Sequence, residues 1–274
     1  MASSILRRVT SSIAIIFLVW VVTFLTPNWT FCILTAIFIG LALHEFFSIM
    51  EKKGIFVYKY FGIVAGIAIP VSIYLHVGEG FENLEPFFIV IACLFTFVLQ
   101  FARKDKADNH LVSIALTLFA LFYISWFLSF FIKIKYLNEG ASLVSFLIIV
   151  TKTGDIGAYF IGKRFGKRPL IPRISPRKTK EGALGGLASS VMAAVLCQSL
   201  VAGFGFFHII LSGFLLGIIG QVGDLAESLF KRDFEVKDSS RALPGLGGIL
   251  DVIDSLLFTT PIFYFYIKIF FPAL

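Results

Sequence analysis

Charged residues are scarce in this 274-residue chain: Asp, Glu, Lys and Arg make up 15% of it, against 58% for hydrophobic residues. Soluble domains average about 25% charged residues and just under half apolar ones. A single soluble core of this length could not bury the excess of apolar residues in this chain. A mean hydropathy of +0.91 points the same way. We therefore predict one membrane domain over residues 1–274, with lipid covering the remaining apolar surface.

Several common motifs for metals and nucleotides are also missing. Each of the three cysteines stands alone in an apolar run without a CxxC pair, which argues against a zinc site or a disulfide framework. The four histidines are scattered without ligand spacing. The chain has neither a Walker A sequence nor a GxGxxG loop. We explain its net charge of +7 by basic cytoplasmic loops that face anionic lipid, so we expect no nucleic-acid partner.

Long apolar segments, by contrast, follow one another from end to end. A helix needs about 20 apolar residues to cross the hydrocarbon core of a bilayer. The sequence therefore predicts an all-α polytopic membrane protein with about nine transmembrane helices. The segments are 10–26, 28–50, 57–77, 86–102, 109–132, 141–162, 183–204, 207–225 and 248–271.

Lys and Arg are distributed unevenly over the loops between these segments. Nearly all of them fall on the side of the N-terminus, many in the loops 163–182 and 226–247. The opposite side holds Lys133, Lys135 and Lys268. Because cytoplasmic loops carry an excess of Lys and Arg, we predict a cytoplasmic N-terminus. Residues 1–140 are mostly plain spans, whereas residues 141–274 carry the polar motifs, whose catalytic loops are expected on the cytoplasmic face.

Six carboxylates fall inside or at the ends of predicted spans, where ionisable groups mark functional sites by default. They are Glu45, Asp155, Asp224, Glu227, Asp251 and Asp254. Asp224, Glu227, Ser228 and Lys231 are offset by 0, +3, +4 and +7, so they share one helix face. Two acids, a hydroxyl and an amine on one helix face could together bind a cation and a phosphate group. An internal salt-bridge network at a helix end is the alternative.

The pattern of acid, acid and serine recurs at Asp251, Asp254 and Ser255, directly after a glycine-rich stretch. Its glycines and proline permit a tight turn and a close approach of backbone to ligand. Asp251 is predicted in the first turn of the last span, where the helix dipole favours a carboxylate for purely structural reasons too.

The other two carboxylates stand in different surroundings. The sequence Gly-Asp-x-Gly around Asp155 is expected to break or thin its helix, with Lys152 as an alternative salt-bridge partner. Glu45 follows His44 without other polar neighbours in the sequence, and we interpret it as an interfacial or packing residue.

The loop LIPRISPRKTKEGALGG mixes basic residues with Ser, Thr, Pro and Gly. This composition suits a triphosphate or a lipid phosphate, although a cytoplasmic loop also explains the charge. With phosphate nearby and oxygen ligands at hand, magnesium fits this set of residues better than zinc.

Residues 228–254 read SLFKRDFEVKDSSRALPGLGGILDVID. This stretch resembles the signature of phosphatidate cytidylyltransferases (CDP-diacylglycerol synthases), S-x-apolar-K-R-x4-K-D followed by P-x-H-G-G and D-R-x-D. The matching residues are Ser228, Lys231, Arg232, Lys237, Asp238, Pro244, Gly247, Gly248, Asp251 and Asp254. Residues 175–182 are similar to the family's SPxKTxEG, residues 155–159 to its D-x-x-A-Y, and residues 221–228 to its QxGDLxES. Leu246 and Val252 replace the usual His and Arg.

The resemblance implies an enzyme of phospholipid biosynthesis that transfers CMP from CTP to phosphatidate, giving CDP-diacylglycerol and pyrophosphate. It implies catalytic roles for Asp224, Asp251, Lys231 and Ser228. Mg²⁺ is expected on Asp224 and Asp251, with Asp155 and Asp254 as further candidate ligands and K⁺ as a candidate second cation. The residues expected to bind substrate or phosphate are Lys178, Arg232, Ser175, Thr179, Glu181, Lys237, Asp238, Gly247 and Gly248.

The expected partners are CTP, phosphatidate and bilayer lipids, with a homodimer expected from the resemblance alone. The expected location is the inner membrane of a bacterial-type cell. Two other functions stay open at this stage. A CTP-dependent lipid kinase acting on a polyprenol-type alcohol would release CDP. An ion-coupled transporter would place its acids near the membrane midplane between related halves, and no such halves are visible.

Overall fold

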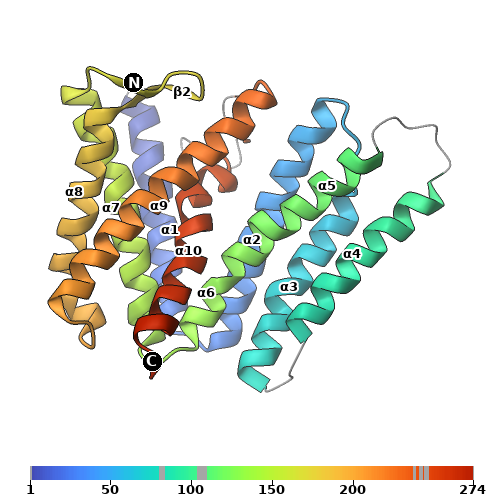
Figure 1. Ribbon diagram of the computed structural model, residues 1–274, viewed down its shortest axis with the longest axis horizontal. Coiled ribbons are helices and arrows are strands. Elements are labelled where there is room, and N and C mark those ends of the chain that lie inside the picture. The colour runs from blue at the N-terminus through green and yellow to red at the C-terminus, as the bar shows by residue number, and fades with distance from the viewer. Residues whose placement is uncertain are drawn as a thin grey trace. The chain divides into compact units, whose positions relative to one another are not determined.

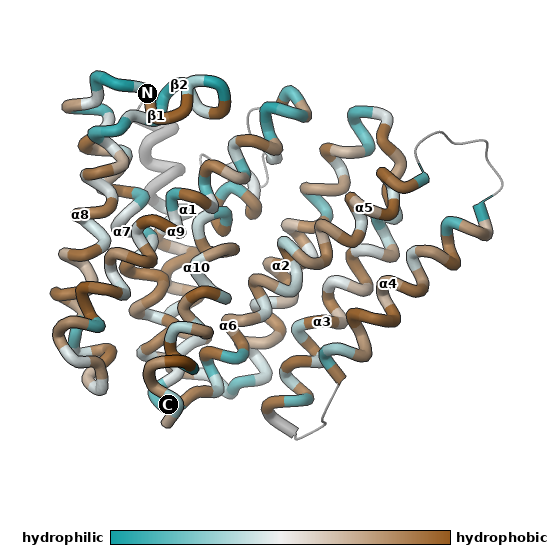
Figure 2. Tube along the Cα trace, viewed as in Figure 1, coloured by the Kyte–Doolittle hydropathy of each residue, from teal (hydrophilic) through white to brown (hydrophobic). Residues whose placement is uncertain are grey.

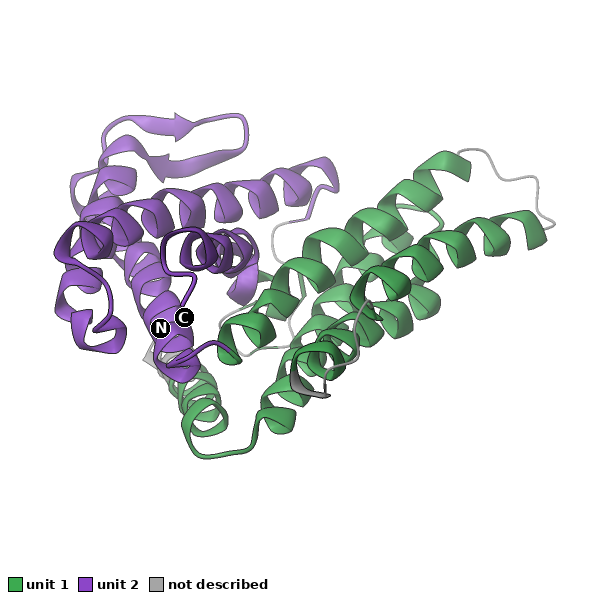
Figure 3. Ribbon diagram, turned by 60° about the horizontal axis from the view of Figure 1, so that its bottom comes forward, with its two compact units in different colours: residues 1–136, 238–251 green, residues 137–237, 252–274 purple. Residues whose placement is uncertain are grey.

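The fold is described from a computed structural model of the whole chain (Figure 1). It describes residues 2–79, 84–103, 110–236, 239–240, 243 and 247–273, with side chains from residue 10 onward except those of 78 and 79. The chain divides into two compact units: residues 1–136 with 238–251, and residues 137–237 with 252–274 (Figure 3). Each unit is described by itself.

The first unit is a bundle of apolar helices. It contains α1 (Ala2–Phe24), α2 (Asn28–Lys52), α3 (Lys59–Glu79), α4 (Leu84–Ala102), α5 (His110–Ala120) and α6 (Phe127–Lys135). A π-helical stretch, Leu121–Trp126, joins α5 to α6. Phe46 and Phe47 on α2 are fully buried and pack edge to face, while Phe46 also contacts Phe119 on α5. The contact of Phe46 with Phe119 joins α2 to α5, and such packing holds helices together where lipid offers no hydrophobic driving force.

The second unit contains most of the polar motifs. Its elements are α7 (Gly140–Phe165), β1 (Pro169–Ile171), β2 (Ser175–Thr179), α8 (Lys180–Leu196), a 3₁₀ turn (Gln198–Val201), α9 (Phe206–Asp233) and α10 (Ile249–Phe270). The boundary between the units falls in the first turn of α10. Helices α7, α8 and α9 lie side by side, and Phe146 of α7 stacks on Phe263 of α10.

Among the described residues, seven helical segments are long and apolar enough to cross a membrane. They correspond to seven of the nine predicted segments, with α5, the π-helical stretch and α6 forming one span, His110–Lys135. The other two predicted segments coincide with α1, whose described apolar part is Thr10–Phe24, and with the 17-residue α8. Large apolar side chains such as Phe101 and Phe160 are exposed, and hydrophobic residues predominate along the helices (Figure 2). The protein is therefore an all-α polytopic membrane protein.

The loop predicted at 163–182 is more ordered than expected. Strands β1 and β2 pair antiparallel, with Pro169 opposite Thr179, and form a hairpin rich in hydrophilic residues (Figure 2). Pro169, Pro172 and Pro176 disfavour a further helical turn between α7 and α8, so the backbone groups of the two strands bond to one another instead.

The expectation that Gly154-Asp155 breaks its helix is wrong: α7 continues from Gly140 to Phe165. The glycines there serve helix packing. A Cβ atom at Gly186 of α8 would lie 2.8 Å from the Ala158 Cβ atom and 2.9 Å from the Gly154 carbonyl oxygen. Small residues let two membrane helices approach this closely.

Candidate functional site

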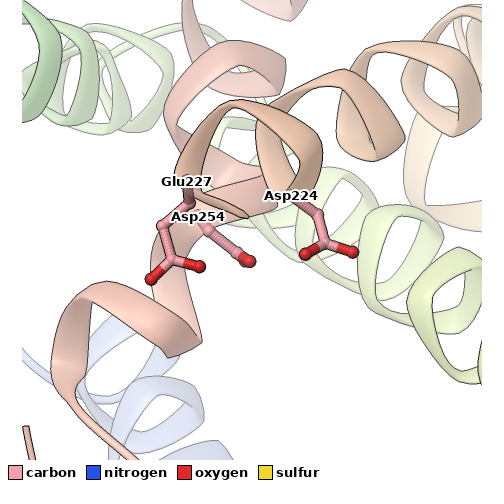
Figure 4. A group of neighbouring side chains, drawn as sticks. All are labelled: Asp224, Glu227 and Asp254. Atoms are coloured by element: carbon pink, nitrogen blue, oxygen red, sulfur yellow. The ribbon is translucent and has the colours of Figure 1, made fainter. Parts of the chain in front are cut away.

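Three carboxylates of the second unit meet between α9 and α10. Asp224 and Glu227 lie one turn apart on α9, and Asp254 comes from α10 (Figure 4). Each contributes an oxygen atom within 4.8 Å of the other two. Gly223 permits the approach, since a Cβ atom there would stand 2.6 Å from the Asp254 carbonyl oxygen. This three-carboxylate group offers only hard oxygen donors, the kind of ligand that Mg²⁺ prefers.

Burial differs sharply within the group. Glu227 is 1% exposed, while the Asp224 side chain is 38% exposed. The Lys231 ammonium, one turn further along α9, lies 2.5 Å from Glu227. A buried carboxylate needs such a charge partner. The predicted shared face of α9 is thus present: Glu227 is buried against the partly exposed Lys231, and Asp224 is accessible.

Lys178 of strand β2 reaches the accessible acid. Its Nζ atom lies 2.8 Å from Asp224 Oδ1 and donates a 3.3 Å hydrogen bond to Ser228 Oγ. The hairpin therefore brings a cation to the acids of α9 from a segment about 50 residues earlier in the chain.

A pocket of about 470 Å³ opens beside Asp224. This volume falls in the range of about 300–1,000 Å³ typical of small-molecule sites. Basic, acidic and hydroxyl side chains converge on it from α7, the hairpin and α9. The polar lining residues are Asp155, Tyr159, Lys163, Ser175, Arg177, Lys178, Thr179, Gln221 and Asp224. Three cations in one pocket next to carboxylates suit a polyanion that binds together with a metal ion.

An apolar groove of about 270 Å³ shares part of this lining. Leu170, Ala183, Gln221 and Leu225 line both, and the groove continues over apolar side chains of α8 and α9. A ligand with a charged head and an apolar tail would find both surfaces in one unit.

Backbone contacts hold the hairpin in place. Thr179 caps α8 by accepting a 3.1 Å hydrogen bond from Gly182 N. Glu181 Oε2 accepts hydrogen bonds from the backbone N–H groups of Lys167 (3.0 Å) and Arg168 (3.1 Å). These N–H groups, Lys167 first, hold the pKa of the Glu181 carboxyl below its usual value. Arg232 Nε donates to the Ile174 carbonyl oxygen at 3.1 Å, which ties α9 to the hairpin turn.

A second polar network links α7 to α10. The Lys152 ammonium of α7 is 3.0 Å from Asp155 Oδ2 and donates a 2.7 Å hydrogen bond to Ser255 Oγ of α10. Ser255 Oγ lies 2.8 Å from Asp155 Oδ2 as well, and its backbone N–H donates to Asp254 Oδ1 at 2.6 Å. Asp155 is thus linked to α10 rather than left alone in the membrane.

In the first unit, Glu45 is buried and fully hydrogen-bonded, which corrects its interpretation as a packing or interfacial residue. Its buried carboxylate accepts hydrogen bonds from the hydroxyls of Ser239 (3.0 Å) and Ser240 (2.6 Å). It also accepts from the backbone N–H groups of Ile249 (3.0 Å) and Leu250 (2.9 Å), at the start of α10. Sequence adjacency could not reveal this role, because its partners lie about 200 residues further along the chain.

Asp251 takes part in the same turn of the first unit. Its Oδ2 atom accepts from Ser239 N (3.0 Å), Ser239 Oγ (2.8 Å) and Gly248 N (2.7 Å). Gly247 has φ +98°, a conformation that favours glycine, and a Cβ atom at Gly248 would collide with Ser239 and Glu45. The glycines expected to approach a ligand instead approach these side chains in the structure.

The chain is similar in sequence to proteins of a known family. The model of the cytidylyltransferase family matches residues 6–270, nearly the whole chain. The chain belongs to the cytidylyltransferase family. The family match includes both units and every element of the candidate site.

Individual relatives of this family member cover less of the chain. It is 41% identical over 153 residues to the uncharacterized protein YnbB of Escherichia coli, covering 56% of this chain and 51% of YnbB. It is 36% identical over 195 residues to a phosphatidate cytidylyltransferase of Bacillus subtilis, covering 70% of this chain and 71% of the relative. A Brucella suis phosphatidate cytidylyltransferase is 45% identical over 131 residues, 48% of each chain. In two of these three comparisons, the alignment thus spans about half of the curated relative.

Apart from Asp254, which belongs to the three-carboxylate group, the predicted site residues fall into four sets. Asp155, Ser175, Lys178, Thr179 and Asp224 line one pocket, with Ser228 bonded to Lys178. Lys231, Arg232 and Glu181 bind neighbouring protein groups outside the pocket lining. Gly247, Gly248 and Asp251 belong to the first unit. Lys237 and Asp238 lie outside the described residues, as do Pro244 and Leu246.

Sequence reasoning left Glu227 out of the expected metal ligands, although its +3 offset from Asp224 was the available signal. Arg177 and Lys163 were also missed as lining residues. Both stand in basic stretches, where sequence alone does not tell a pocket cation from a cytoplasmic-loop cation.

Proposed function

We propose that this chain is a phosphatidate cytidylyltransferase, which transfers CMP from CTP to phosphatidate and releases pyrophosphate, leaving CDP-diacylglycerol in the membrane. One observation carries the proposal: a three-carboxylate group, with oxygen atoms within 4.8 Å of one another, whose Asp224 lines a polar pocket of about 470 Å³. The family match and the names of the Bacillus and Brucella relatives support the same activity.

The reaction requires two anions to meet. A phosphate oxygen of phosphatidate attacks the α-phosphorus of CTP, and the bond from that phosphorus to the pyrophosphate oxygen breaks. Positioning and charge neutralisation supply most of the catalysis in such transfers. Lys163, Arg177 and Lys178 line the pocket and bind the phosphates under this proposal. The apolar groove receives part of the acyl region, since it shares lining residues with the pocket.

The donor set fits a divalent metal ion. Asp224, Glu227 and Asp254 would hold Mg²⁺, which would supply polarisation of the phosphoryl oxygens. Asp155 and Asp251 stay candidate ligands from the sequence, as does K⁺ as a second cation. Lys178 orients Asp224 and Ser228 from the other side of the pocket.

The proposal also includes a location. The bacterial relatives and the membrane-spanning helices support an inner-membrane protein. The excess of Lys and Arg in the loops 163–182 and 226–247 supports a cytoplasmic face for the pocket, where CTP is present, and a cytoplasmic N-terminus. A homodimer remains an expectation from the family resemblance.

The test uses the full chain purified in detergent with phosphatidate, Mg²⁺ and CTP labelled on the α-phosphate. We expect label to enter the lipid phase only when both substrates are present, and pyrophosphate to appear in equal amount. Failure of well-folded protein to label lipid would refute the proposal. Transfer of label from γ-labelled CTP to a polyprenol would instead identify a lipid kinase.

A further inference from the structure

Lys152 is an unusual residue for its position. It lies in the middle of α7, a membrane-spanning helix, where an ammonium group is unfavourable unless it is paired. Ionisable groups at such positions mark functional sites by default. Its Nζ atom contacts Asp155 at 3.0 Å, Ser255 at 2.7 Å and Asp254 at 3.9 Å. One cation from α7 thus meets an acid on its own helix and two residues on α10.

These contacts connect Lys152 to the three-carboxylate group through Asp254. Asp254 belongs to that group, and Asp155 lines the polar pocket. Lys178 and Lys231 contact the other two carboxylates of the group, Asp224 and Glu227. Among the ion pairs of the described residues, Lys152 is the cation that contacts both Asp254 and Asp155.

Residue 252 links this observation to the sequence. The family signature D-R-x-D has an Arg one residue after its first Asp, and this chain has Val252 there. Residues 252 and 255 are three apart on α10, so they share a helix face. Lys152 donates to Ser255, on the face where the signature would carry its Arg.

We propose that Lys152 is a positioning residue that supplies, from α7, the positive charge that the family signature places at residue 252. It balances the charge of Asp155 and Asp254, and it orients the Ser255 hydroxyl that donates to Asp155. Asp254 is thereby kept in the geometry that it needs within the three-carboxylate group. This inference rests on the proposed cytidylyltransferase activity.

Relocation of the charge tests it. The variants are Lys152→Met, Lys152→Arg, Val252→Arg and the double variant Lys152→Met with Val252→Arg, each assayed for transfer of α-labelled CMP to phosphatidate. Lys268→Met is the matched control, because Lys268 is exposed in the last turn of α10. Monodispersity and the thermal unfolding midpoint in detergent establish that each variant is folded.

We expect Lys152→Met to lower kcat by about 100-fold, as displacement of a reacting group does, with a much smaller change in KM for CTP. Lys152→Arg should keep most of the activity. The double variant should be about tenfold more active than Lys152→Met alone, because the two substitutions are coupled. Rescue by a charge on another helix is a result that a simple packing role for Lys152 would not produce.

Several results would overturn the inference. Wild-type kcat in Lys152→Met would show that the charge is not needed, and equal inactivity of Lys152→Arg and Lys152→Met would show that charge is not what matters. A folded double variant no more active than Lys152→Met would also contradict it. If Val252→Arg does not fold, the comparison of Arg and Met at 152 still decides. Lack of transfer by the wild-type protein would instead refute the proposed function, and this inference with it.

Discussion

Glu45 accepts a 2.9 Å hydrogen bond from the backbone N–H group of Leu250, a residue 205 positions further along the chain. The same carboxylate accepts from Ile249 N and from two serine hydroxyls. Helix α10 begins with N–H groups that have no partner within the helix, and Glu45 satisfies two of them from α2. A buried carboxylate with four donors fixes the position of this helix start.

Glu45→Gln should therefore destabilise the protein by about 2 kcal/mol, because an amide nitrogen would face N–H donors and leave them unsatisfied. Glu51→Gln on the same helix is the control, since the Glu51 side chain is 47% exposed and pairs with Lys59 alone among the ion pairs described. The thermal unfolding midpoint in detergent measures both. Equal midpoints for the two variants would argue against an anchoring role for Glu45.

The three-carboxylate group should bind a divalent cation directly. Asp224→Asn and Asp254→Asn should each weaken Mn²⁺ binding, measured by titration calorimetry, and lower lipid labelling by about 100-fold. Asp233→Asn is the matched control on α9, because Asp233 is exposed at the end of the helix. Unchanged Mn²⁺ binding in both site variants would place the metal elsewhere.

Lys178 should contribute to nucleotide binding. Because Lys178 lines the pocket and its Nζ atom lies 2.8 Å from Asp224, Lys178→Met should raise KM for CTP by about tenfold. Lys180→Met, two residues away on the exposed first position of α8, should leave KM unchanged. Steady-state assays at varied CTP compare the two. A rise of similar size in both variants would indicate a general effect of loop charge.

The contact between α7 and α8 should tolerate no side chain at Gly186. Gly186→Ala would force its Cβ atom against Ala158, and overpacking of this kind destabilises by about 1–3 kcal/mol. Gly203→Ala offers a matched control, since a Cβ atom there meets nothing within 4 Å. We expect a lower unfolding midpoint for the first variant only. An unchanged unfolding midpoint for Gly186→Ala would show that the two helices can move apart without a loss of stability.

Glu181 should make a pH-dependent contribution to stability. Its folded pKa is lowered from the ordinary value of 4.5, so the contribution is present above pH 4.5 and is lost as pH falls through the folded pKa. Glu181→Gln should therefore lower the unfolding midpoint at pH 7, and the difference from wild type should shrink on acidification below pH 4.5. A difference that grows as the pH falls would contradict the assignment.

Much of the fold follows from local pattern. Apolar runs long enough to cross a bilayer predict helices because every backbone group in lipid must bond within its own segment. The common face of Asp224, Glu227, Ser228 and Lys231 follows from helical periodicity alone, and α9 has it. The hairpin at 169–179 and the continuity of α7 through Gly154 were not predictable, since both depend on what packs beside them.

The sequence by itself determined that this is a helical membrane protein with a family signature in its second half, because composition and periodicity are properties of neighbouring residues. Only the tertiary structure decided which side chains act together. Asp254 joins the acids of α9, Lys152 bonds Ser255 across 103 positions, and Glu45 reaches the start of α10. The physical reason is that such contacts depend on how closely helices pack, as at Gly223, where the absence of a side chain lets α9 approach α10.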